Sequence, residues 1–428
     1  MPAPQWLPAW KRDEGARRVL ALFARTFHDD GETGPLPGTP DGVWSAPGRV
    51  NLIGEHTDYN AGLSLPTALP HRTYVALRRR ADDVVRIVSE QTDEPWTIRL
   101  ADVRPGELHG WGTYVAGVAW ALRQAGHDVR GFDAVVDSCV PFGASLSSSA
   151  AIECAFAVAL DDTFGLGLGA DDAGRAQLVA AARRAENEIA GAPTGGLDQS
   201  ASLLCADGQA LLLDFRPGLA PGDFAQPVPF DLAAAGLALL VIDTRAPHQL
   251  VDGQYAERRA SCETAAELLG VGSLREVTPS DLDAALDDLA PHDHENTLRR
   301  RVRHVVTETA RTAELVALVR EGLGADGVPD EEAVARVGRL LNASHASLRD
   351  DYEVTVRETD LAVDASLAAG AVGARMTGGG FGGSTIALVR TSEVDAVATA
   401  VATAFAQAGL TAPAFVAAPP SDAAGRDA

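Results

Sequence analysis

Segments with strand-like and helix-like patterns are mixed along the whole chain, without the strict strand–helix–strand rhythm of a doubly wound parallel sheet. The strand-like stretches are 43–53, 73–79, 84–89, 132–138, 237–243 and 384–390. The stretches with helical spacing are 11–28, 111–126, 149–164, 171–190, 254–269, 280–288, 298–322, 330–349 and 392–408. Such a mixture predicts an α+β fold, in which helices and sheets form separate layers.

The 428 residues are too many for one ordinary core, and they predict two domains. A stretch rich in proline and glycine, 216–229, is the best candidate linker, which places the domains at 1–215 and 216–428. Just before it, 199–214 alternates short apolar runs with turn residues, as a β-hairpin does. The small, polar residues of 418–428 predict a frayed tail.

The charged residues exclude several classes of protein. The net charge of −23 opposes binding to nucleic acid and to anionic membranes, so that any bound polyanion needs a local pocket. The 36 lysines and arginines include a single lysine, Lys11, and the chain has no GxxxxGK(S/T) phosphate loop. Positive charge at an active site must therefore come from arginine or from a metal ion.

The cysteines indicate a reducing compartment. The four residues, at 139, 154, 205 and 262, have no CxxC spacing and are typical of free thiols. The N-terminal residues contain no apolar core of signal-peptide length, and no run of about 18 apolar residues occurs. We therefore expect a cytoplasmic protein that binds neither nucleic acid nor membrane, and no segment indicates an obligate protein partner.

The first of four polar motifs is SAPGRVNLIGEHTDYNAG, at 45–62. An apolar strand turns at Gly54 and presents Glu55, His56 and Asp58 close together, while Arg49 lies on the strand where it could face a phosphate. So many polar groups are costly to bury without a partner, and a sugar supplies many donors and acceptors. Two alternatives stay open: a polar turn that begins with Asp58, and a metal site that uses His56 and Asp58.

The second motif is VPFGASLSSSAA, at 140–151, which leads directly into a helix. Backbone N–H groups at a helix N-terminus are unpaired and carry partial positive charge. Gly143 lets the chain approach a phosphate closely, and Ser147, Ser148 and Ser149 add hydroxyl donors. The motif is typical of anion binding without lysine, although serines in this position are equally typical of helix N-caps.

The third motif is GARMTGGGFGGSTIALV, at 373–389, in which five of the six residues 378–383 are glycine. Such a run raises the entropy cost of folding and favours a loop that wraps its backbone closely around a ligand. A plain glycine-rich turn is the alternative.

The fourth motif is AENEIAGAPTGGLDQ, at 185–199. Glu186 lies on a helix that ends near Gly191, and Asp198 follows a Gly-Gly turn. Asp198 is a candidate base or positioning carboxylate, and Glu186 is a candidate ligand for Mg²⁺. As isolated residues, both are equally typical of solvated surface acids.

Together these motifs resemble those of the GHMP kinases, the superfamily of galactokinase and of homoserine, mevalonate and phosphomevalonate kinases. GRVNLIGEHTDYNAG resembles the galactokinase signature almost residue for residue, whereas VPFGASLSSSA and GARMTGGGFGG resemble the phosphate loop and glycine motif of the superfamily. The stretches 298–308 and 344–354 also resemble galactokinases, so that the resemblance extends from about residue 44 to 390. It implies a ribosomal-S5-like N-terminal domain beside a ferredoxin-like C-terminal domain, with ATP bound in the cleft.

The resemblance also implies an activity and a set of site residues. ATP would phosphorylate the anomeric hydroxyl of galactose, with Asp198 as the catalytic carboxylate and Arg49 stabilising the transferring phosphoryl group. The residues that would line the sugar site are Glu55, His56, Thr57, Asp58, Gly195 and Tyr255. The residues that would hold the ATP phosphates are Gly143, Ala144, Ser145, Leu146, Ser147, Ser148 and Ser149. Ser149 and Glu186 would lie near Mg²⁺, and Trp111 and Ser89 near the adenine.

The sequence departs from the family pattern at four positions. Ser145 stands in the phosphate loop where the family usually has glycine, and Thr194 stands where cysteine is common. Gly253 and Ala256 replace the usual serine and asparagine. The first departure affects the nucleotide site and the others affect contacts to the sugar, but none removes a proposed catalytic group.

Two other functions remain open from the residues. A catalytically inactive sugar sensor would share the scaffold, but it would be expected to lack Asp198, Arg49 or the serine loop, and all are present. A metal-dependent hydrolase that uses His56 and Asp58 would leave the glycine motif unexplained. The sequence does not choose between Asp198 as a base and Asp198 as an electrostatic positioner.

Overall fold

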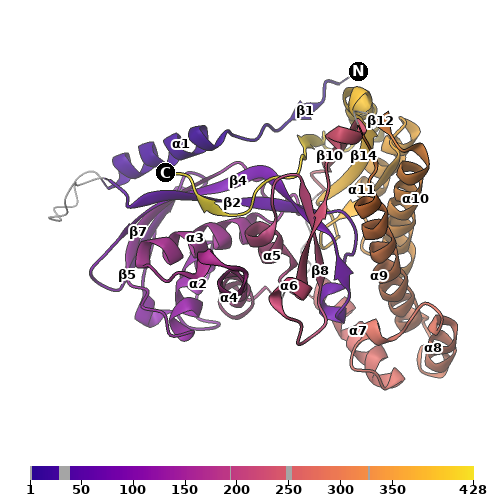
Figure 1. Cartoon of the computed structure of the whole chain (residues 1–428), viewed down its shortest axis with the longest axis horizontal. Helices are drawn as coiled ribbons and strands as arrows, with labels where there is room; N and C mark the ends of the chain where they lie inside the picture. Colours follow the sequence, from indigo (N-terminus) through magenta and orange to yellow (C-terminus); the bar gives the residue numbers. More distant parts are fainter. Residues whose placement is uncertain (1, 28–38, 193, 247–252, 326–327) are drawn as a thin grey trace.

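Two large sheets and the helices that cover them make up the computed structural model, which describes residues 2–27, 39–192, 194–246, 253–325 and 328–428 (Figure 1). The sheet of the N-terminal half lies at the left of Figure 1, and the long helices of the C-terminal half lie at the right. The predicted α+β architecture is therefore confirmed. No helix in the described ranges is long and apolar enough to span a membrane.

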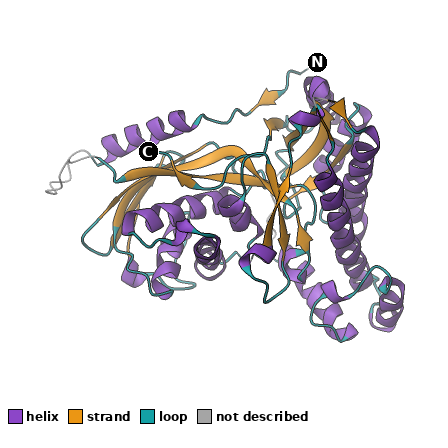
Figure 2. Ribbon diagram, in the orientation of Figure 1, coloured by secondary structure: helices purple, strands orange, loops and turns teal. Residues whose placement is uncertain are grey.

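The sheet of the N-terminal half has six strands, and helices cover both of its faces (Figure 2). Its strands, in spatial order, are β16 (Gly425–Arg426), β2 (Gly42–Asn51), β4 (Pro66–Arg79), β7 (Phe132–Ser138), β5 (Val84–Ser89) and β6 (Trp96–Arg99). Only β5 and β7 are parallel among these pairs. One face packs on α1 (Arg12–Thr26), and the other on α2 (Gly112–Gln124), α3 (Ser148–Phe164), α4 (Asp172–Arg184) and α5 (Leu197–Leu204).

Along β4, successive apolar side chains point to opposite faces of the sheet, which explains why helices pack on both faces. Tyr74 and Ala76 pack in the cluster under α1, whereas Val75 and Leu77 pack in the cluster formed with α2, α3 and α4. Successive side chains of a strand point to opposite faces, so a strand that is buried on both sides reads as a continuous apolar run.

The sheet of the C-terminal half has the spatial order β1 (Gln5–Trp6), β15 (Ala414–Ala417), β10 (Leu237–Asp243), β14 (Ser384–Arg390) and β13 (Gly373–Thr377). The four strands β15, β10, β14 and β13 are antiparallel neighbours. Leu240 and Ile242 face the cluster of α11 (Arg357–Ala368) and α12 (Val394–Ala408). In chain order, β10, α11, β13, β14, α12 and β15 make the predicted ferredoxin-like βαββαβ arrangement.

The other face of this sheet packs against long helices. Leu239 and Val241 join a cluster with α9 (Thr297–Glu321) and α10 (Glu331–Ser347). Beside α9 lie α7 (Gln254–Leu269) and α8 (Leu282–Leu289). Short elements complete the chain: β3 (Leu63–Ser64), β8 (Gln209–Asp214), α6 (Pro221–Phe224), β9 (Ala225–Pro229), β11 (Gly324–Ala325) and β12 (Val328–Pro329).

Two predictions between residues 199 and 229 are wrong. The expected hairpin over 199–214 is a helix, α5, followed by one strand, β8. The expected linker over 216–229 contains β9, which pairs with β8 in the three-stranded sheet β3–β8–β9. β9 is an edge strand, where Pro227 and Pro229 are tolerated because one side of the strand donates no hydrogen bond to the sheet.

The prediction of a frayed tail over 418–428 is also wrong. Strand β16 pairs with β2, and Ala424 is buried. The buried Arg72 donates hydrogen bonds to the carbonyl oxygens of Asp422 and Ala423, both at 2.8 Å. These contacts use the main chain of the tail, which the small side chains do not reveal.

Each end of the chain adds a strand to the sheet of the other half. β1 extends the C-terminal sheet beside β15, and β16 extends the N-terminal sheet beside β2. The division after residue 215 itself stays a prediction.

Candidate active site

The three loops predicted from the sequence meet between the two sheets. Ser384, at the end of the glycine loop, donates a hydrogen bond to the carbonyl of Ala144 at 2.6 Å. On its other side, the amide of Gly378 donates to Glu55 at 3.0 Å, and His56 Nε2 lies 3.2 Å from the carbonyl of Gly379. The glycine loop therefore separates the phosphate loop from the turn Glu55–Asp58, which we call the sugar turn.

Close approach explains the glycines of this loop. A Cβ atom on Gly378 would lie 2.8 Å from the Cβ of Ser145, and one on Gly383 would lie 2.1 Å from the Ser145 hydroxyl oxygen. Both glycines also have positive φ angles, 87° and 77°. Gly378 and Gly383 are thus needed for packing against the phosphate loop.

Arg49 and Asp198 form an ion pair beside the phosphate loop. Arg49 Nη2 lies 2.7 Å from Asp198 Oδ1, and Ser147 donates to Asp198 Oδ2 at 2.6 Å. Arg49 Nη1 also donates to the carbonyl of Ser145 at 2.7 Å. Arg49 is buried on β2, whereas the Asp198 side chain, in the first turn of α5, keeps 21% of its surface exposed. The pair combines a fixed cation with an accessible carboxylate.

The phosphate loop has the backbone shape of an anion site. Gly143, Ser145 and Ser147 have φ angles of 69°, 57° and 58°, and α3 begins at Ser148. Ser147 occupies the N-cap position, but its side chain makes no capping hydrogen bond and binds Asp198 instead. The alternative of a simple serine cap is therefore not supported, and the first N–H groups of α3 remain available to an anion.

The carboxylate of Glu186 is buried next to the phosphate loop. It lies in a π-helical turn, Ala185–Ala190, and accepts hydrogen bonds from Ser149 at 3.0 Å, Thr194 at 2.8 Å and Gln199 at 2.6 Å. Burial, and next the charge of Asp198, raise the pKa of Glu186. All of these donors are neutral, so a cation would relieve the cost of burying this charge.

This donor set fits Mg²⁺ in part. Glu186 and Ser149 offer two hard oxygen ligands, and Mg²⁺ typically takes one or two protein ligands together with substrate phosphates. In the described ranges, no group of three or more His, Cys, Asp and Glu side chains could hold a metal ion. The alternative of a metal site on His56 and Asp58 gains no support, because both ring nitrogens of His56 are hydrogen-bonded.

The sugar turn divides into buried and accessible residues. Thr57 is fully buried, and its hydroxyl lies 2.9 Å from the carbonyl of Gly54 and 2.7 Å from that of Leu63. Glu55 is buried against Arg375, and its contacts with Arg375, Thr377 and Gly378 leave one of its roughly four acceptor positions open within the described structure. Asp58 is partly exposed, and burial, followed by the charge of Asp198, raises its pKa to about 6. The structure thus gives Thr57 a structural role.

The side chain of Asp58 leaves no space for a Cβ atom at residue 195, so this position requires glycine. A Cβ atom at Gly195 would lie only 2.0 Å from Asp58 Oδ2. The predicted sugar residues Asp58 and Gly195 are therefore in direct contact, and the segment just before α5, the helix that carries Asp198, packs on the sugar turn.

An aromatic group surrounds His56. Its ring centroid lies 5.3 Å from that of Tyr255 and 4.7 Å from that of Tyr352, and its Nδ1 lies 2.9 Å from the Tyr59 hydroxyl. Burial lowers the pKa of His56 to about 3, so the ring is neutral; Nε2 donates to Gly379, and Nδ1 accepts from Tyr59. Tyr59 and Tyr352 were missed as site residues, although both lie in stretches that resemble galactokinases.

A cavity of about 410 Å³ joins the predicted adenine and phosphate positions. Its lining includes Ser89 and Trp111 as well as Ser148 and Ser149. Phe142, two-thirds exposed, also lines the cavity. A nucleotide whose phosphates lie at the start of α3 would place its base in this cavity.

The departures from the family pattern have definite positions. Thr194 donates a hydrogen bond to Glu186, the predicted ligand for Mg²⁺, and its expected contact with the sugar stays a prediction. Gly253 precedes α7 with a φ of 121°, and the exposed Ala256 lies in the first turn of that helix, next to Tyr255.

Three family models match separate parts of the chain. The galactokinase galactose-binding signature matches residues 36–79, the N-terminal domain of GHMP kinases matches 113–206, and their C-terminal domain matches 330–407. The first match contains Arg49 and the sugar turn, the second contains the phosphate loop and Asp198, and the third contains the glycine loop.

Individual relatives agree with these matches. The chain is 51% identical to the galactokinase of Streptomyces coelicolor over 90% of its own length and 94% of that protein. It is 45% identical to the galactokinase of Mycobacterium tuberculosis, over 87% and 95% of the two chains.

Solved structures agree as well. The structure of Lactococcus lactis galactokinase complexed with galactose matches with a TM-score of 0.83 and 31% identity, over 95% of this chain and 99% of that one. Methanococcus jannaschii mevalonate kinase, 14% identical with a TM-score of 0.58 over 88% of this chain and 98% of that one, shares the fold alone. From its loops, its fold and these relatives, the chain belongs to the galactokinase family of GHMP kinases.

Proposed function

We propose that Asp198 and Arg49 act as a pair on the hydroxyl and the phosphoryl group that react. The chain is a galactokinase, which phosphorylates galactose with ATP. The observation that carries the proposal is the 2.7 Å ion pair between Arg49 and Asp198, placed between the sugar turn and the start of α3. An anomeric hydroxyl at this point would meet the carboxylate, while the guanidinium would face the phosphoryl group that moves towards it.

The positive groups and the carboxylate have different roles in phosphoryl transfer. Phosphoryl transfer depends mainly on positioning and charge neutralisation, which Arg49 and the free N–H groups of α3 supply. Arg49 is also held by the carbonyl of Ser145, so it needs little reorganisation during reaction. Asp198 orients the hydroxyl and could accept its proton.

Mg²⁺, bound by Ser149 and Glu186, would neutralise the charge of the ATP phosphates. Thr194 and Gln199 would then orient the Glu186 carboxylate from its other oxygen. Trp111 and Ser89 would contact the adenine, and Asp58, Gly195, Tyr255 and the open acceptor of Glu55 would contact galactose. We retain the cytoplasm as the proposed location, because all four cysteines are free thiols.

The activity is tested by ADP release with a panel of acceptors. The panel contains galactose, N-acetylgalactosamine, a pentose analogue, mevalonate and homoserine, each with Mg²⁺ and ATP. We expect galactose to be the preferred acceptor. Turnover of mevalonate or homoserine with none of galactose would contradict the assignment, and binding of galactose without any turnover would instead support an inactive sensor.

A further inference from the structure

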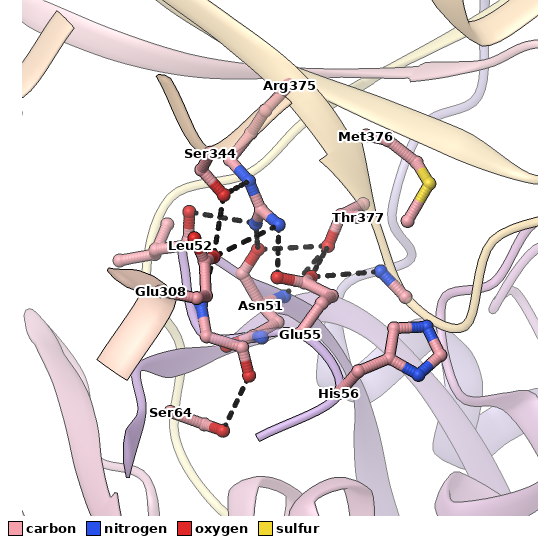
Figure 3. Close-up of polar contacts among 12 residues, drawn as sticks. Asn51, Leu52, Glu55, His56, Ser64, Glu308, Ser344, Arg375, Met376 and Thr377 are labelled. Carbon is pink, nitrogen blue, oxygen red and sulfur yellow. Dashed lines mark hydrogen bonds and ion pairs between the residues drawn. The ribbon is translucent and has the colours of Figure 1, made fainter. Parts of the chain in front are cut away.

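Arg375 is a buried cation outside the set of residues assigned to the reaction. It lies on β13, at the start of the glycine motif, and its side chain is fully buried. An isolated buried guanidinium would be strongly destabilising, so its hydrogen-bond and ion-pair partners must compensate the cost of removing its charge from water. Figure 3 shows that these partners are Ser344, on α10, the backbone of Asn51 and Leu52, just before the sugar turn, and Glu55, its first residue.

Every nitrogen of Arg375 has a partner. Nη1 donates to the carbonyl oxygens of Asn51, at 3.3 Å, and Leu52, at 3.1 Å. Nη2 pairs with Glu55, and Nε donates to Ser344 at 3.1 Å (Figure 3). One side chain from the C-terminal half thus contacts Asn51, Leu52 and Glu55, at and just before the start of the sugar turn.

Glu308, on α9, contacts the residue just before the sugar turn, Gly54. It accepts a hydrogen bond from the amide of Gly54 at 3.0 Å and one from Ser344 at 2.6 Å. Its Oε1 lies 3.9 Å from Arg375 Nη2, and Arg311 donates to its other oxygen at 2.8 Å. The charges of Glu55 and Glu308 are therefore balanced by Arg375 and Arg311.

Thr377, two residues after Arg375, adds a third contact. Its hydroxyl accepts from the amide of Asn51 at 3.1 Å and lies 2.9 Å from the carbonyl of the same residue. Gly54 at the turn has a φ of 95°, so the main chain there is sharply bent and needs such fixed partners.

We propose that Arg375 is a positioning residue for the galactose site, which holds residues Asn51–Glu55 in the conformation that binds the sugar. It touches neither galactose nor the transferring phosphoryl group, and it acts through the backbone and through the orientation of the Glu55 carboxylate. The planar fork of arginine is needed, because a lysine ammonium at this place cannot reach Glu55, Ser344 and two carbonyls together. The inference rests on galactose being the acceptor.

The test compares Arg375→Lys with Arg311→Lys. Both changes replace an arginine that faces Glu308 in the same network, although Arg375 is fully buried and the Arg311 side chain keeps 15% of its surface exposed. In the described structure Arg311 pairs with Glu308 and makes no hydrogen bond or ion pair with residues 51–58. For Arg375→Lys we expect the Kd of galactose, measured by calorimetry, and its KM to rise about tenfold, which corresponds to about 1.4 kcal/mol. The KM of ATP should stay within about twofold, and Arg311→Lys should leave both constants within about twofold.

A second variant, Thr377→Val, tests the inference if Arg375→Lys fails to fold. It removes a hydroxyl contact to Asn51 without leaving an unpaired charge, and galactose affinity should fall about threefold with ATP unaffected. Unchanged galactose affinity in every folded variant, or an equal loss in Arg311→Lys, would overturn the inference. Absence of galactose turnover in the wild-type chain would instead refute the proposed function.

Discussion

At the scale of single residues, Asp198 is the group on which the chemistry depends most. Asp198→Asn is nearly isosteric, and the amide can still bind a sugar hydroxyl, but it carries no charge and accepts no proton. We expect kcat to fall about a hundredfold or more, as the loss of a general base does. Galactose affinity, measured by calorimetry, should change much less. Turnover at the wild-type rate in a variant that binds both substrates would remove Asp198 from the mechanism.

The pH dependence of that variant separates the two carboxylates. If Asp198 is a base, the acidic limb of the wild-type log kcat profile should disappear from the residual activity of Asp198→Asn. A limb that persists near pH 6 would belong to Asp58, because burial raises the pKa of Asp58 to about 6. His56 is excluded from that role, because burial lowers its pKa to about 3.

Ser145 tests how the phosphate loop tolerates a residue other than glycine. Its φ of 57° is costly for serine by about 1 kcal/mol or more, and its side chain also fills the space beside Gly383. Ser145→Gly should leave the KM of ATP unchanged or lower it, without altering the KM of galactose. Ser145→Ala is the control, since it removes the hydroxyl but keeps the strain. A strong loss of activity in both variants would show that the hydroxyl contacts the nucleotide.

Motif residues could be predicted, but the partners that orient them could not. The sequence places Glu55, His56 and Asp58 on one turn, yet Arg375 contacts Glu55 from 320 positions away. Thr57 also belongs to the motif, but its hydroxyl contacts the carbonyls of Gly54 and Leu63 and the hydroxyl of Ser64. Whether a polar side chain faces a ligand or the backbone depends on tertiary packing, which a local pattern does not contain.

At the scale of elements, strong periodicity predicted the long helices and buried strands, whereas short elements were missed. The apolar face of α9 repeats over seven turns, so 298–322 was correct within about one residue at each end. Helix α11 was not predicted, and the short α5 was taken for part of a hairpin. Both acquire their form from packing on a sheet, which overrides weak local preference.

The C-terminal tail gives an element-scale prediction. Deletion of residues 419–428 removes β16 and the two carbonyl oxygens that bind the buried Arg72. Two lost charge-assisted hydrogen bonds should destabilise the chain by about 2 kcal/mol or more, seen as a lower midpoint of thermal unfolding. Asp422→Asn is the matched control, because it keeps both carbonyls. Equal midpoints for the deletion and the control would mean that the tail does not stabilise the fold.

At the scale of the whole molecule, the chain is acidic and buries several carboxyl groups around the site. The chain carries a net charge of −23, and burial raises the pKa of Glu55, Asp58, Glu153 and Glu186 around the site. Glu153, on α3, is fully buried and bonded to Gln199 at 2.9 Å, and its second oxygen has no partner within the described structure. Around the proposed site for ATP and Mg²⁺, these carboxyl groups are therefore unfavourable in their charged form when no ligand is bound.

This arrangement predicts how stability depends on pH. A carboxyl whose folded pKa is raised contributes stability that is present below its unfolded pKa and is lost as pH rises through the folded pKa. Between pH 6.5 and 8.5, in metal-free buffer, we therefore expect the unfolding midpoint of the ligand-free chain to fall, with Glu153 contributing up to about 1.4 kcal/mol per pH unit. Glu153→Gln should reduce this slope and stabilise the chain at the alkaline end, because burial raises the pKa of Glu153 well above its usual range. The exposed Glu257→Gln changes the net charge equally, so it should leave the slope as it is. If Glu153→Gln kept the wild-type slope, the alkaline loss of stability would have to come from net charge repulsion and not from this buried acid.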